Sequence, residues 1–364
     1  MYSAACRPGV VALLYVAYRI REAYRMRRSD YCRAVEHRSR FYTELWHDAA
    51  SQLEAVVEPL GSEILEIRLG GNCTRVQQNT TAMDSSITIA VAQNKPVVHR
   101  LLAQRHLRTP VYCEFTVNEI AKATAFVERA GCKCVVKPTT GGGGRGVTTG
   151  ITRSLDLARA VANARIYSTS LMIEQQVSGD LYRLLYFEGE LMDAVLRKPT
   201  TVIADGKSTI RELIHLENET RVKIGPTLAH ALITIDTDVR NTLSHQRLTL
   251  SSVPKQGLEV TLKTVINDNS QHDNVAAKHL VCRSIIDDGA AAAEAVGVRL
   301  AGIDVITPDP TVSLAESGGV ILEVNTTPSF HQHYYKRDGS YPVAVYLLPN
   351  LLANGVAKRH TVFA

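Results

Sequence analysis

Apolar positions recur along the chain with two different periods, which predict alternating helices and strands. Helical spacing is clear at Phe41, Leu45, Ala49 and Leu53. Pro59 and Gly61 are expected to end that helix, because both residue types interrupt helical structure. Residues 63–68 then alternate apolar and polar side chains, as a strand does. Residues 1–93 are therefore expected to form an N-terminal helical and α/β region.

The pattern becomes sharper after residue 94. A helix is expected from Lys95 to about residue 104, and Thr116-x-x-Glu119 is a capping box ahead of a second helix that Gly131 ends. Residues 134–137 read as a strand, and the β-formers at 147–149 follow a run of glycines. The glycines are therefore expected to join one strand to another.

The second half of the chain is predicted to contain further strands and two helices. Strands are expected at 171–174, 181–187, 191–197, 301–306 and 320–324, with a hairpin turn at Glu188-Gly189, and helices at 209–217 and 275–296. Residues 222–274 are polar and weakly periodic, and we interpret them as a long insertion or loop. The expected division is a central subdomain at 94–187 and a C-terminal subdomain at 188–364.

Composition narrows the class of protein. The chain has 364 residues, 45% of them hydrophobic and 21% charged, and a net charge of +5. This mildly basic balance suits a protein that handles anionic small molecules and does not require nucleic acid as a partner. The 7 cysteines include no Cys-x-x-Cys pair, which favours a reducing, cytoplasmic location. The apolar run at 10–18 is too short to span a membrane, and a helix with a basic continuation is expected there.

The glycine run at Gly141–Gly146, which contains Arg145, is the first chemical signal. It matches G-x-G-x-x-G formally, but a dinucleotide site needs a following helix and strand formers follow here. A P-loop ending at Gly206-Lys207-Ser208 fails because Thr201 stands where its first glycine is needed. The sequence also lacks the His-Arg-Asp and Asp-Phe-Gly triplets of protein kinases. Glycines still let backbone N–H groups approach a polyphosphate closely, and the alternative is a flexible surface turn.

Polar side chains on two apolar strands are the second signal. Glu323 and Asn325 lie two apart and share one face of a strand, and Asp304 lies midway along another. Buried carboxylates need partners, and hard oxygen ligands suit Mg²⁺, which is commonly shared with nucleotide phosphates. Salt bridges to Lys or Arg on neighbouring strands are the alternative.

Taken in order, these motifs resemble the ATP-grasp superfamily. The ordered set is Val135-Val136-Lys137-Pro138, the glycine loop, Ile173-Glu174, Asp304 and Glu323-Val324-Asn325-Thr326-Thr327-Pro328. The phrases 179–183, 204–210 and 300–305 are similar to the ATP-grasp modules of cyanophycin synthetase and bifunctional glutathione synthetases. The resemblance covers roughly residues 81–352. It implies an α/β (α+β) fold in which two α+β subdomains sandwich ATP.

The resemblance also implies roles for individual residues. The nucleotide would be bound by Lys95, Lys137, Gly142, Gly143, Gly144, Arg145, Gly146, Glu174, Gln175, Val177 and Asp180. Glu174 would receive the adenine amino group and Asp180 the ribose hydroxyls. Asp304, Glu323 and Asn325 would hold two Mg²⁺ ions, with Mn²⁺ as an alternative. Arg183 and Arg197 would lie near the γ-phosphate and the acyl phosphate as catalytic residues.

The implied activity is that of an ATP-dependent carboxylate–amine ligase. Such an enzyme activates a carboxylate as an acyl phosphate, passes it to an amine, and releases ADP and phosphate. The expected substrates are a small-molecule carboxylate and an amine, amino acid or peptide in character, and a homo-oligomer is expected by resemblance. Alternatives are a non-catalytic nucleotide-binding regulator, a thiol or hydroxyl acceptor, and a binder of anionic polymers through the N-terminal arginines.

Two stretches depart from the family pattern. A glycine pair is missing from Asn267–His272, and Ser329 stands where glycine commonly follows Pro328. His331 and His333 follow, and they are expected to contact substrate, to act as a base, or to have no role in the chemistry. These departures leave the identity of both substrates open.

Overall fold

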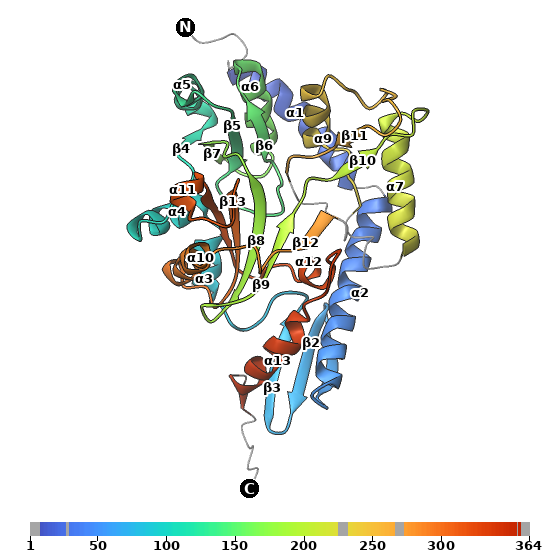
Figure 1. The fold of residues 1–364 in the computed structure, drawn as a ribbon, viewed down its shortest axis with the longest axis vertical. Coiled ribbons are helices and arrows are strands. Elements are labelled where there is room, and N and C mark those ends of the chain that lie inside the picture. The colour runs from blue at the N-terminus through green and yellow to red at the C-terminus, as the bar shows by residue number, and fades with distance from the viewer. Residues whose placement is uncertain (1–7, 27–28, 225–231, 266–272, 355, 358–364) are drawn as a thin grey trace.

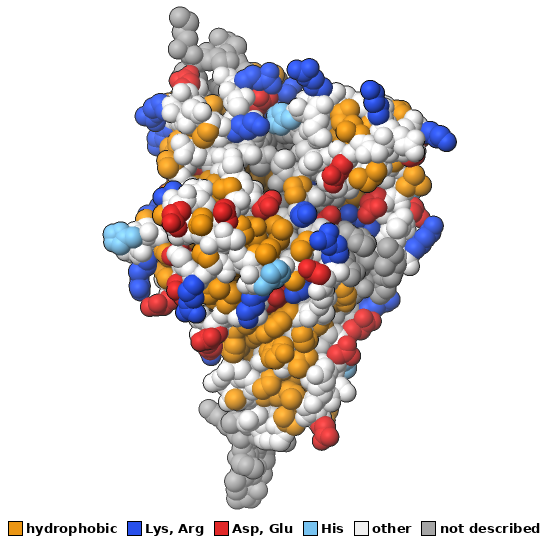
Figure 2. Space-filling view, in the orientation of Figure 1, with side chains coloured by type: hydrophobic (Ala, Val, Ile, Leu, Met, Phe, Trp, Pro, Cys, Tyr) orange, Lys and Arg blue, Asp and Glu red, His pale blue; other side chains and the backbone are white. Residues whose placement is uncertain are grey.

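The computed structural model describes residues 8–26, 29–224, 232–265, 273–354 and 356–357, and within them every strand pairing is antiparallel (Figure 1). Two sheets of four strands, one of five and a two-stranded ladder make up the β structure. No helix in the described part of the chain is both long and apolar enough to cross a membrane. On the face shown in Figure 2, apolar side chains gather over the lower part, and basic and acidic side chains are interspersed above.

The five-stranded sheet is the centre of the molecule (Figure 1). Its strands, in spatial order, are β12 (Asn274–Ala276), β9 (Glu190–Arg197), β8 (Asp180–Phe187), β13 (Leu300–Thr307) and β14 (Val320–Asn325). The expected hairpin turn forms at Glu188 and Gly189, which both have positive φ, the geometry that two-residue hairpin turns require. Helices α3 (Ser86–Ala92), α4 (Lys95–Gln104) and α10 (Arg283–Val296) cover one face. Side chains on the opposite face of this sheet line the candidate site.

A second sheet, of four strands, carries the glycine loop between two of its strands. Its spatial order is β4 (Tyr112–Thr116), β7 (Ser170–Gln175), β5 (Cys134–Pro138) and β6 (Thr148–Ile151). Helices α5 (Ile120–Ala130) and α6 (Ser154–Ala164) pack against it, and α1 (Pro8–Met26) packs against α6. The predicted capping box forms at a short 3-10 turn (Val117–Glu119) before α5, and Gly131 ends α5 in the left-handed conformation. The prediction that the glycines join two strands is confirmed, because β5 pairs with β6.

The N-terminal region forms a third core that it shares with the C-terminal end of the chain. Helix α2 (Ser29–Ser51) packs with α13 (Val343–Ala353) on a sheet whose spatial order is β1 (Val56–Gly61), β2 (Ile64–Leu69), β3 (Asn72–Gln77) and β15 (Val356–Ala357). Trp46 and Phe330 are both fully buried in this core. Residues far apart in sequence are therefore needed to complete it.

The helix end expected at Pro59 and Gly61 is wrong. Helix α2 ends at Ser51, and Pro59 and Gly61 lie in β1. Strand β1 is at an edge of its sheet, where a proline without an N–H group is tolerated.

The interpretation of residues 222–274 as a loop is also wrong for the part that the structure describes. A small subdomain forms from β10 (Thr201–Ile203), α7 (Ile210–Ile224), α9 (Thr237–His245) and β11 (Glu259–Thr261). Its own apolar core includes Ile210, Val239 and Val260. Single apolar residues spread over short elements produce little periodicity, which is why the sequence pattern missed them.

Two helix boundaries and one domain boundary also differ from the expectations. The helix expected at 209–217 continues to Ile224, and the one expected from 275 begins at Arg283, because Val275 lies in β12. A boundary after residue 187 would cut the β8–β9 hairpin, since β8 belongs to the five-stranded sheet. The change from one sheet to the other falls between β7 and β8.

Close packing of α10 on the central sheet provides a test of the fold. Gly289 lies against the fully buried ring of Tyr186, and an added Cβ would stand 2.7 Å from Cζ and 2.9 Å from Cε2 of that ring. We expect Gly289→Ala to lower the free energy of unfolding by about 1–3 kcal/mol, although alanine favours helix. Urea unfolding measures this, with the exposed α10 variant Ser284→Ala as the control. A Gly289→Ala protein as stable as wild type would contradict this packing.

Candidate active site

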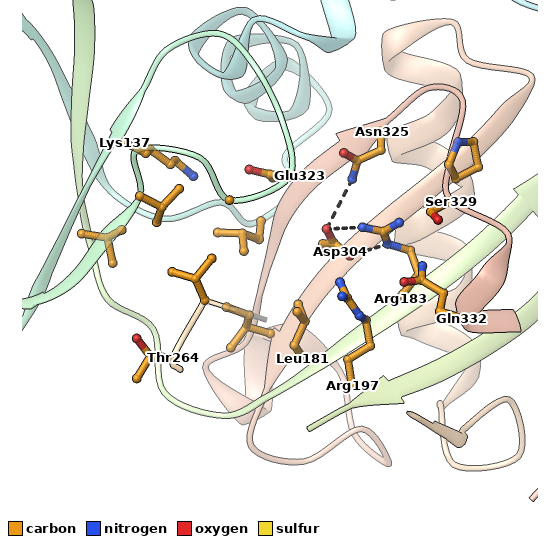
Figure 3. Close-up of a pocket in the computed structure, with 18 of the residues that line it drawn as sticks. Lys137, Leu181, Arg183, Arg197, Thr264, Asp304, Glu323, Asn325, Ser329 and Gln332 are labelled. Atoms are coloured by element: carbon orange, nitrogen blue, oxygen red, sulfur yellow. Dashed lines mark hydrogen bonds and ion pairs between the residues drawn. The ribbon is translucent and has the colours of Figure 1, made fainter. Parts of the chain in front are cut away.

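A cavity of ≈ 760 Å³ lies between the four-stranded and five-stranded sheets (Figure 3). It is lined by the predicted site residues Lys137, Gly143, Gly144, Glu174, Gln175, Val177, Asp180, Arg183, Arg197, Asp304, Glu323 and Asn325. A neighbouring cavity of ≈ 510 Å³ is lined by Lys95, Gly142 and Arg145 and shares Glu323 and Asn325. The structure thus brings together residues that are more than two hundred positions apart in sequence.

Lys137 and Glu174 form a buried ion pair on the wall made by the four-stranded sheet. Lys137 lies in β5 and Glu174 in the neighbouring β7, with 2.8 Å between Nζ and Oε2, and both side chains are 3% exposed. Burial raises the pKa of Glu174, and the positive charge of Lys137 opposes this. In this structure the lysine is therefore the partner of the carboxylate that was expected to meet adenine.

Arg183, Asp304 and Glu323 stand directly across from one another on β8, β13 and β14. Arg183 binds Asp304 through two hydrogen bonds, from Nε to Oδ1 at 2.5 Å and from Nη2 to Oδ2 at 2.8 Å (Figure 3). Asn325 donates from Nδ2 to Oδ2 of Asp304 at 3.3 Å. Burial acts to lower the pKa of Arg183, but Asp304 outweighs burial and the pKa is raised. The guanidinium of Arg183 is therefore held in its charged form.

Lys95 brings a second lysine to the same acidic group. It is the first residue of α4, which Asn94 caps, and its Nζ lies 2.7 Å from the Gly141 carbonyl oxygen and 3.7 Å from Oε1 of Glu323. Burial acts to raise the pKa of Glu323, but the charges of Lys95, Lys137 and Arg183 outweigh burial and lower it. Glu323 is therefore an anion surrounded by cations.

Arg197 adds a further cation at the end of β9. Its pKa is lowered to about 10 because the guanidinium is buried and Arg183 is nearby. A positive charge that is disfavoured in this way is stabilised when an anion enters the cavity.

The glycine loop between β5 and β6 borders both cavities. A Cβ added at Gly141, Gly142 or Gly143 would meet no other atom within 4 Å, so this part of the loop is open on its outer side. Gly146 differs, because its Cβ would stand 2.7 Å from the Tyr167 ring and its φ is +76°. Gly146 lines neither of the two cavities and instead permits close packing beside α6.

Sequence reasoning missed a strap of the small subdomain that also lines the larger cavity. Thr264 and Val265 form this strap, and Asp238 accepts hydrogen bonds from both of their backbone N–H groups at 3.0 and 2.9 Å. The departure from the family pattern at Asn267–His272 lies outside the described residues. In the sequence, Asp238 is one polar residue in a polar stretch. Its burial and its bonds to the strap become visible only in the folded structure.

Residues of the N-terminal region also line the larger cavity and were missed. They are Arg38, Tyr42 and Asn79. Arg38 binds Asn79, and the partners of Tyr42 and Asn79 lie near the other end of the chain, so no local sequence pattern marks these residues. The tyrosine hydroxyl, for example, contacts Ser329 Oγ at 3.3 Å and accepts a hydrogen bond from the Phe330 N–H group at 3.2 Å.

The two histidines after Pro328 have different surroundings. His331 lines the cavity, with Nδ1 at 2.6 Å from Ser329 Oγ. His333 is fully buried, and its Nδ1 lies 2.8 Å from Asp193 Oδ2. Burial lowers the pKa of His333 and outweighs the opposing effect of Asp193. The buried ring holds α12 (His331–Tyr334) against β9 rather than lining the cavity.

The acidic group suits one kind of metal ion. Among the described residues, no group of three or more His, Cys, Asp and Glu side chains is placed to hold a metal by itself. Asp304, Glu323 and Asn325 supply two carboxylates and one amide beside a cation-rich cavity. These donors fit Mg²⁺, which is commonly bound through one or two carboxylates and completed by substrate phosphates and water.

Comparison with known proteins gives relatives in sequence, although no protein-family model matches the chain. It is 27% identical over 312 residues to cyanophycin synthetase of Trichormus variabilis, covering 81% of this chain and 34% of that protein. It is 26% identical over 267 residues to the glutathione biosynthesis bifunctional protein GshAB of Streptococcus agalactiae, covering 72% and 35%. The chain thus spans about a third of the length of these relatives.

The fold has a counterpart among solved structures. A bifunctional glutathione synthetase from Pasteurella multocida matches with a TM-score of 0.53 and 23% identity, covering 82% of this chain and 41% of that one. The α+β architecture of the ATP-grasp fold is therefore confirmed, as is the resemblance to these synthetases.

His99 lines the smaller cavity, and its pKa reports on the positive charge there without any ligand. It lies on α4, is 1% exposed, and its ring meets Tyr112 edge to face. Its pKa is lowered from 6.5 to about 4, because burial disfavours the imidazolium and Lys137 and Lys95 repel it.

We predict that His99 makes the protein less stable in mild acid. The unfolded chain binds this proton near pH 6.5 and the folded chain only near pH 4, so stability falls as the pH drops through that window. The full loss is on the order of 3 kcal/mol. Urea unfolding at pH 7 and pH 4.5 should show a smaller difference for His99→Gln than for wild type. The exposed variant His47→Gln should keep the wild-type dependence, and an unchanged dependence in His99→Gln would contradict the prediction.

Proposed function

We propose that this chain, which has the ATP-grasp fold, is an ATP-dependent and Mg²⁺-requiring carboxylate–amine ligase. It would form an amide or peptide bond through an acyl phosphate and release ADP and orthophosphate. The observation that carries the proposal is the cavity in which Lys137, Arg183 and Arg197 meet Asp304 and Glu323. Cations and metal-ligating carboxylates together are what phosphoryl transfer between two anions requires.

The wall formed by β5, β7 and the start of β8 would bind the nucleotide. Glu174 and the backbone at Gln175 and Val177 would meet the adenine, and the exposed Asp180 would meet the ribose. Lys137 is already at 2.8 Å from Glu174 and would reach toward the phosphates from there. The neighbouring cavity supports a place for the terminal phosphates, since Lys95 and Arg145 line it.

The acidic group would hold the metal ions. Asp304, Glu323 and Asn325 would ligate them, and bound Mg²⁺ would supply positive charge to the phosphate oxygens. In this structure Arg183 and Lys95 balance those carboxylates instead. The proposed number of two ions follows from the family resemblance.

Arg183 and Arg197 would act on the reacting groups. A substrate carboxylate oxygen would attack the γ-phosphorus, forming the acyl–O–P bond while the bond to ADP breaks. The amine would then attack the acyl carbon, lose a proton and expel orthophosphate. Both guanidinium groups face the cavity and would reduce the repulsion between the two anions in the first step. The open glycine loop would close over the phosphates and keep water from the acyl phosphate.

The substrates are proposed to be amino acids or peptides. Two classes of relative, named for cyanophycin and glutathione, support this choice. A cytoplasmic location is likewise a proposal. The five cysteines whose side chains the structure describes, Cys73, Cys113, Cys132, Cys134 and Cys282, are free, which is in keeping with a reducing compartment.

The first test is release of phosphate from ATP and Mg²⁺ with pooled amino acids, dipeptides and dicarboxylates. We expect substrate-dependent ADP and orthophosphate from wild type and none above background from Glu323→Gln, because the amide cannot supply the ligand charge. Circular dichroism should show an unchanged fold. The exposed variant Glu294→Gln is the matched control and should keep wild-type rates. Formation of AMP and pyrophosphate, or a fully active Glu323→Gln enzyme, would reject the proposed chemistry.

A second test separates nucleotide binding from turnover. Lys137→Met should raise the Kd for ATP about tenfold or more, because a charge-assisted contact to the nucleotide is lost. Isothermal titration with and without Mg²⁺ measures this. Lys133→Met, which changes an exposed lysine just before β5, should bind ATP as wild type does. Unchanged affinity in the Lys137 variant would remove this lysine from the nucleotide site.

A further inference from the structure

One end of the larger cavity is walled by residues that the ATP-grasp resemblance does not account for. Arg38, Tyr42 and Asn79 precede the stretch that resembles the family, and Ser329 and Gln332 lie where this chain departs from it. We call these five residues the N-terminal wall. All five line the same cavity as Arg183 and Asn325, and Figure 3 shows Ser329 and Gln332 close to Arg183, so the wall borders the space where a substrate would lie.

Gln332 in this wall has an unused hydrogen-bond donor. The residue is only 1% exposed, yet its Nε2 has no hydrogen-bond partner within the described part of the chain. Figure 3 places its side chain next to Arg183 at the edge of the cavity. A buried amide without a partner is costly to stability, so its retention points to a ligand that accepts the hydrogen bond.

Arg38 supplies a positive charge to the same wall. Its Nη2 donates to Asn79 Oδ1 at 3.1 Å, and its guanidinium carbon lies 5.9 Å from the centre of the Tyr42 ring. No carboxylate pairs with Arg38 among the residues that the structure describes. The guanidinium is therefore oriented by neutral neighbours while its charge stays available to an anion.

The wall is held firmly in place from behind. Asn79 donates from Nδ2 to the Thr327 carbonyl oxygen, and Thr327 has a positive φ of 42°. Behind α12, His333 and Lys336 both bind the buried Asp193, the lysine at 2.9 Å from Oδ2. These contacts keep the donors of the wall in position before a ligand enters, which lowers the entropic cost of binding.

Phosphate and the reacting carboxylate already have partners elsewhere in the cavity. Lys137 lies on the wall proposed to bind the nucleotide, Lys95 lies in the neighbouring cavity near Glu323, and Arg183 and Arg197 face the acidic group. Arg38 borders both cavities, and in the larger one it stands with Gln332 in the N-terminal wall, where the two offer one cation and one neutral donor. A planar carboxylate matches this pair, because guanidinium and amide N–H groups can bind its two oxygens.

We propose that the N-terminal wall binds the unreacted carboxylate of an amino-acid or short-peptide substrate, with Arg38 as its ion-pair partner and Gln332 as a hydrogen-bond donor. This inference rests on the proposed ligase function and names the substrate class of the same site. Helix α2 would thereby select substrates that carry a free carboxylate besides the reacting groups.

Binding in the presence of MgADP, where no chemistry occurs, tests the proposal. The probes are two matched mixtures of the common amino acids and dipeptides, one with free C-terminal carboxylates and one with C-terminal amides. Thermal shift titrations of the whole chain give the apparent affinity for each. Arg38→Gln removes the charge, Arg38→Lys keeps it, and Gln332→Met removes the donor at similar volume. Arg40→Gln, at an exposed position of the same helix, is the matched control.

Wild type and Arg40→Gln should bind the acid mixture about tenfold or more tightly than the amide mixture. Arg38→Gln should lose that preference, Arg38→Lys should recover part of it, and Gln332→Met should weaken it without lowering the melting temperature of the ligand-free protein. Arg40→Gln and Gln332→Met should bind MgATP as wild type does, because neither residue lines the neighbouring cavity that is proposed to hold the terminal phosphates.

The proposal is overturned if Arg38→Gln keeps the preference, if wild type has none, or if neither mixture shifts the melting temperature. Failure of the ligase function itself is a separate result, because it would appear as absent ADP formation or absent MgATP binding.

Discussion

The buried ion pair between Arg183 and Asp304 sets the conditions for the whole cavity. Removing two charges from water costs several kcal/mol per ion, and only excellent geometry offsets this. The two hydrogen bonds of 2.5 and 2.8 Å provide that geometry, because antiparallel pairing places the two residues exactly across from each other on β8 and β13. Replacing such a pair with apolar residues is often neutral or stabilising. Its presence here is therefore better explained by chemistry than by stability.

Other buried charges around the site are also paired with an opposite charge. Lys137 is balanced by Glu174, Lys95 lies near Glu323, and Asp193 is bound by both His333 and Lys336. Each pair joins elements from different parts of the chain, so the charges are balanced only when the two sheets and α12 are in place. The outcome is a cavity whose cations are already oriented, and the charged form of Arg197 is disfavoured there by burial and by repulsion from Arg183. Entry of a polyanion would relieve that repulsion.

Two regions outside the two sheets that form the cavity complete its lining. The small subdomain contributes the strap at Thr264 and Val265, which Asp238 holds through backbone hydrogen bonds. Helix α2 contributes Arg38 and Tyr42 and shares its apolar core with α13. Unlike the sheets, which present side chains to the cavity from strands, these two regions present them from a loop and from a helix face. They are suited to determine which substrate enters, while the sheets carry the cations and carboxylates of the proposed phosphoryl transfer.

The sequence by itself determined the elements whose signals are local. The helix at Lys95, the capping box at Thr116, the strands around the glycine loop and the carboxylates at Asp304 and Glu323 followed from periodicity and from motifs of a few residues. Tertiary structure decided the partners of those groups. Local patterns show that Asp304 needs a partner, but only strand register identifies Arg183, and only packing brings Arg38 and Gln332 to one wall. The physical reason is that charge compensation and cavity shape depend on contacts between distant residues, which leave no periodic trace in the chain.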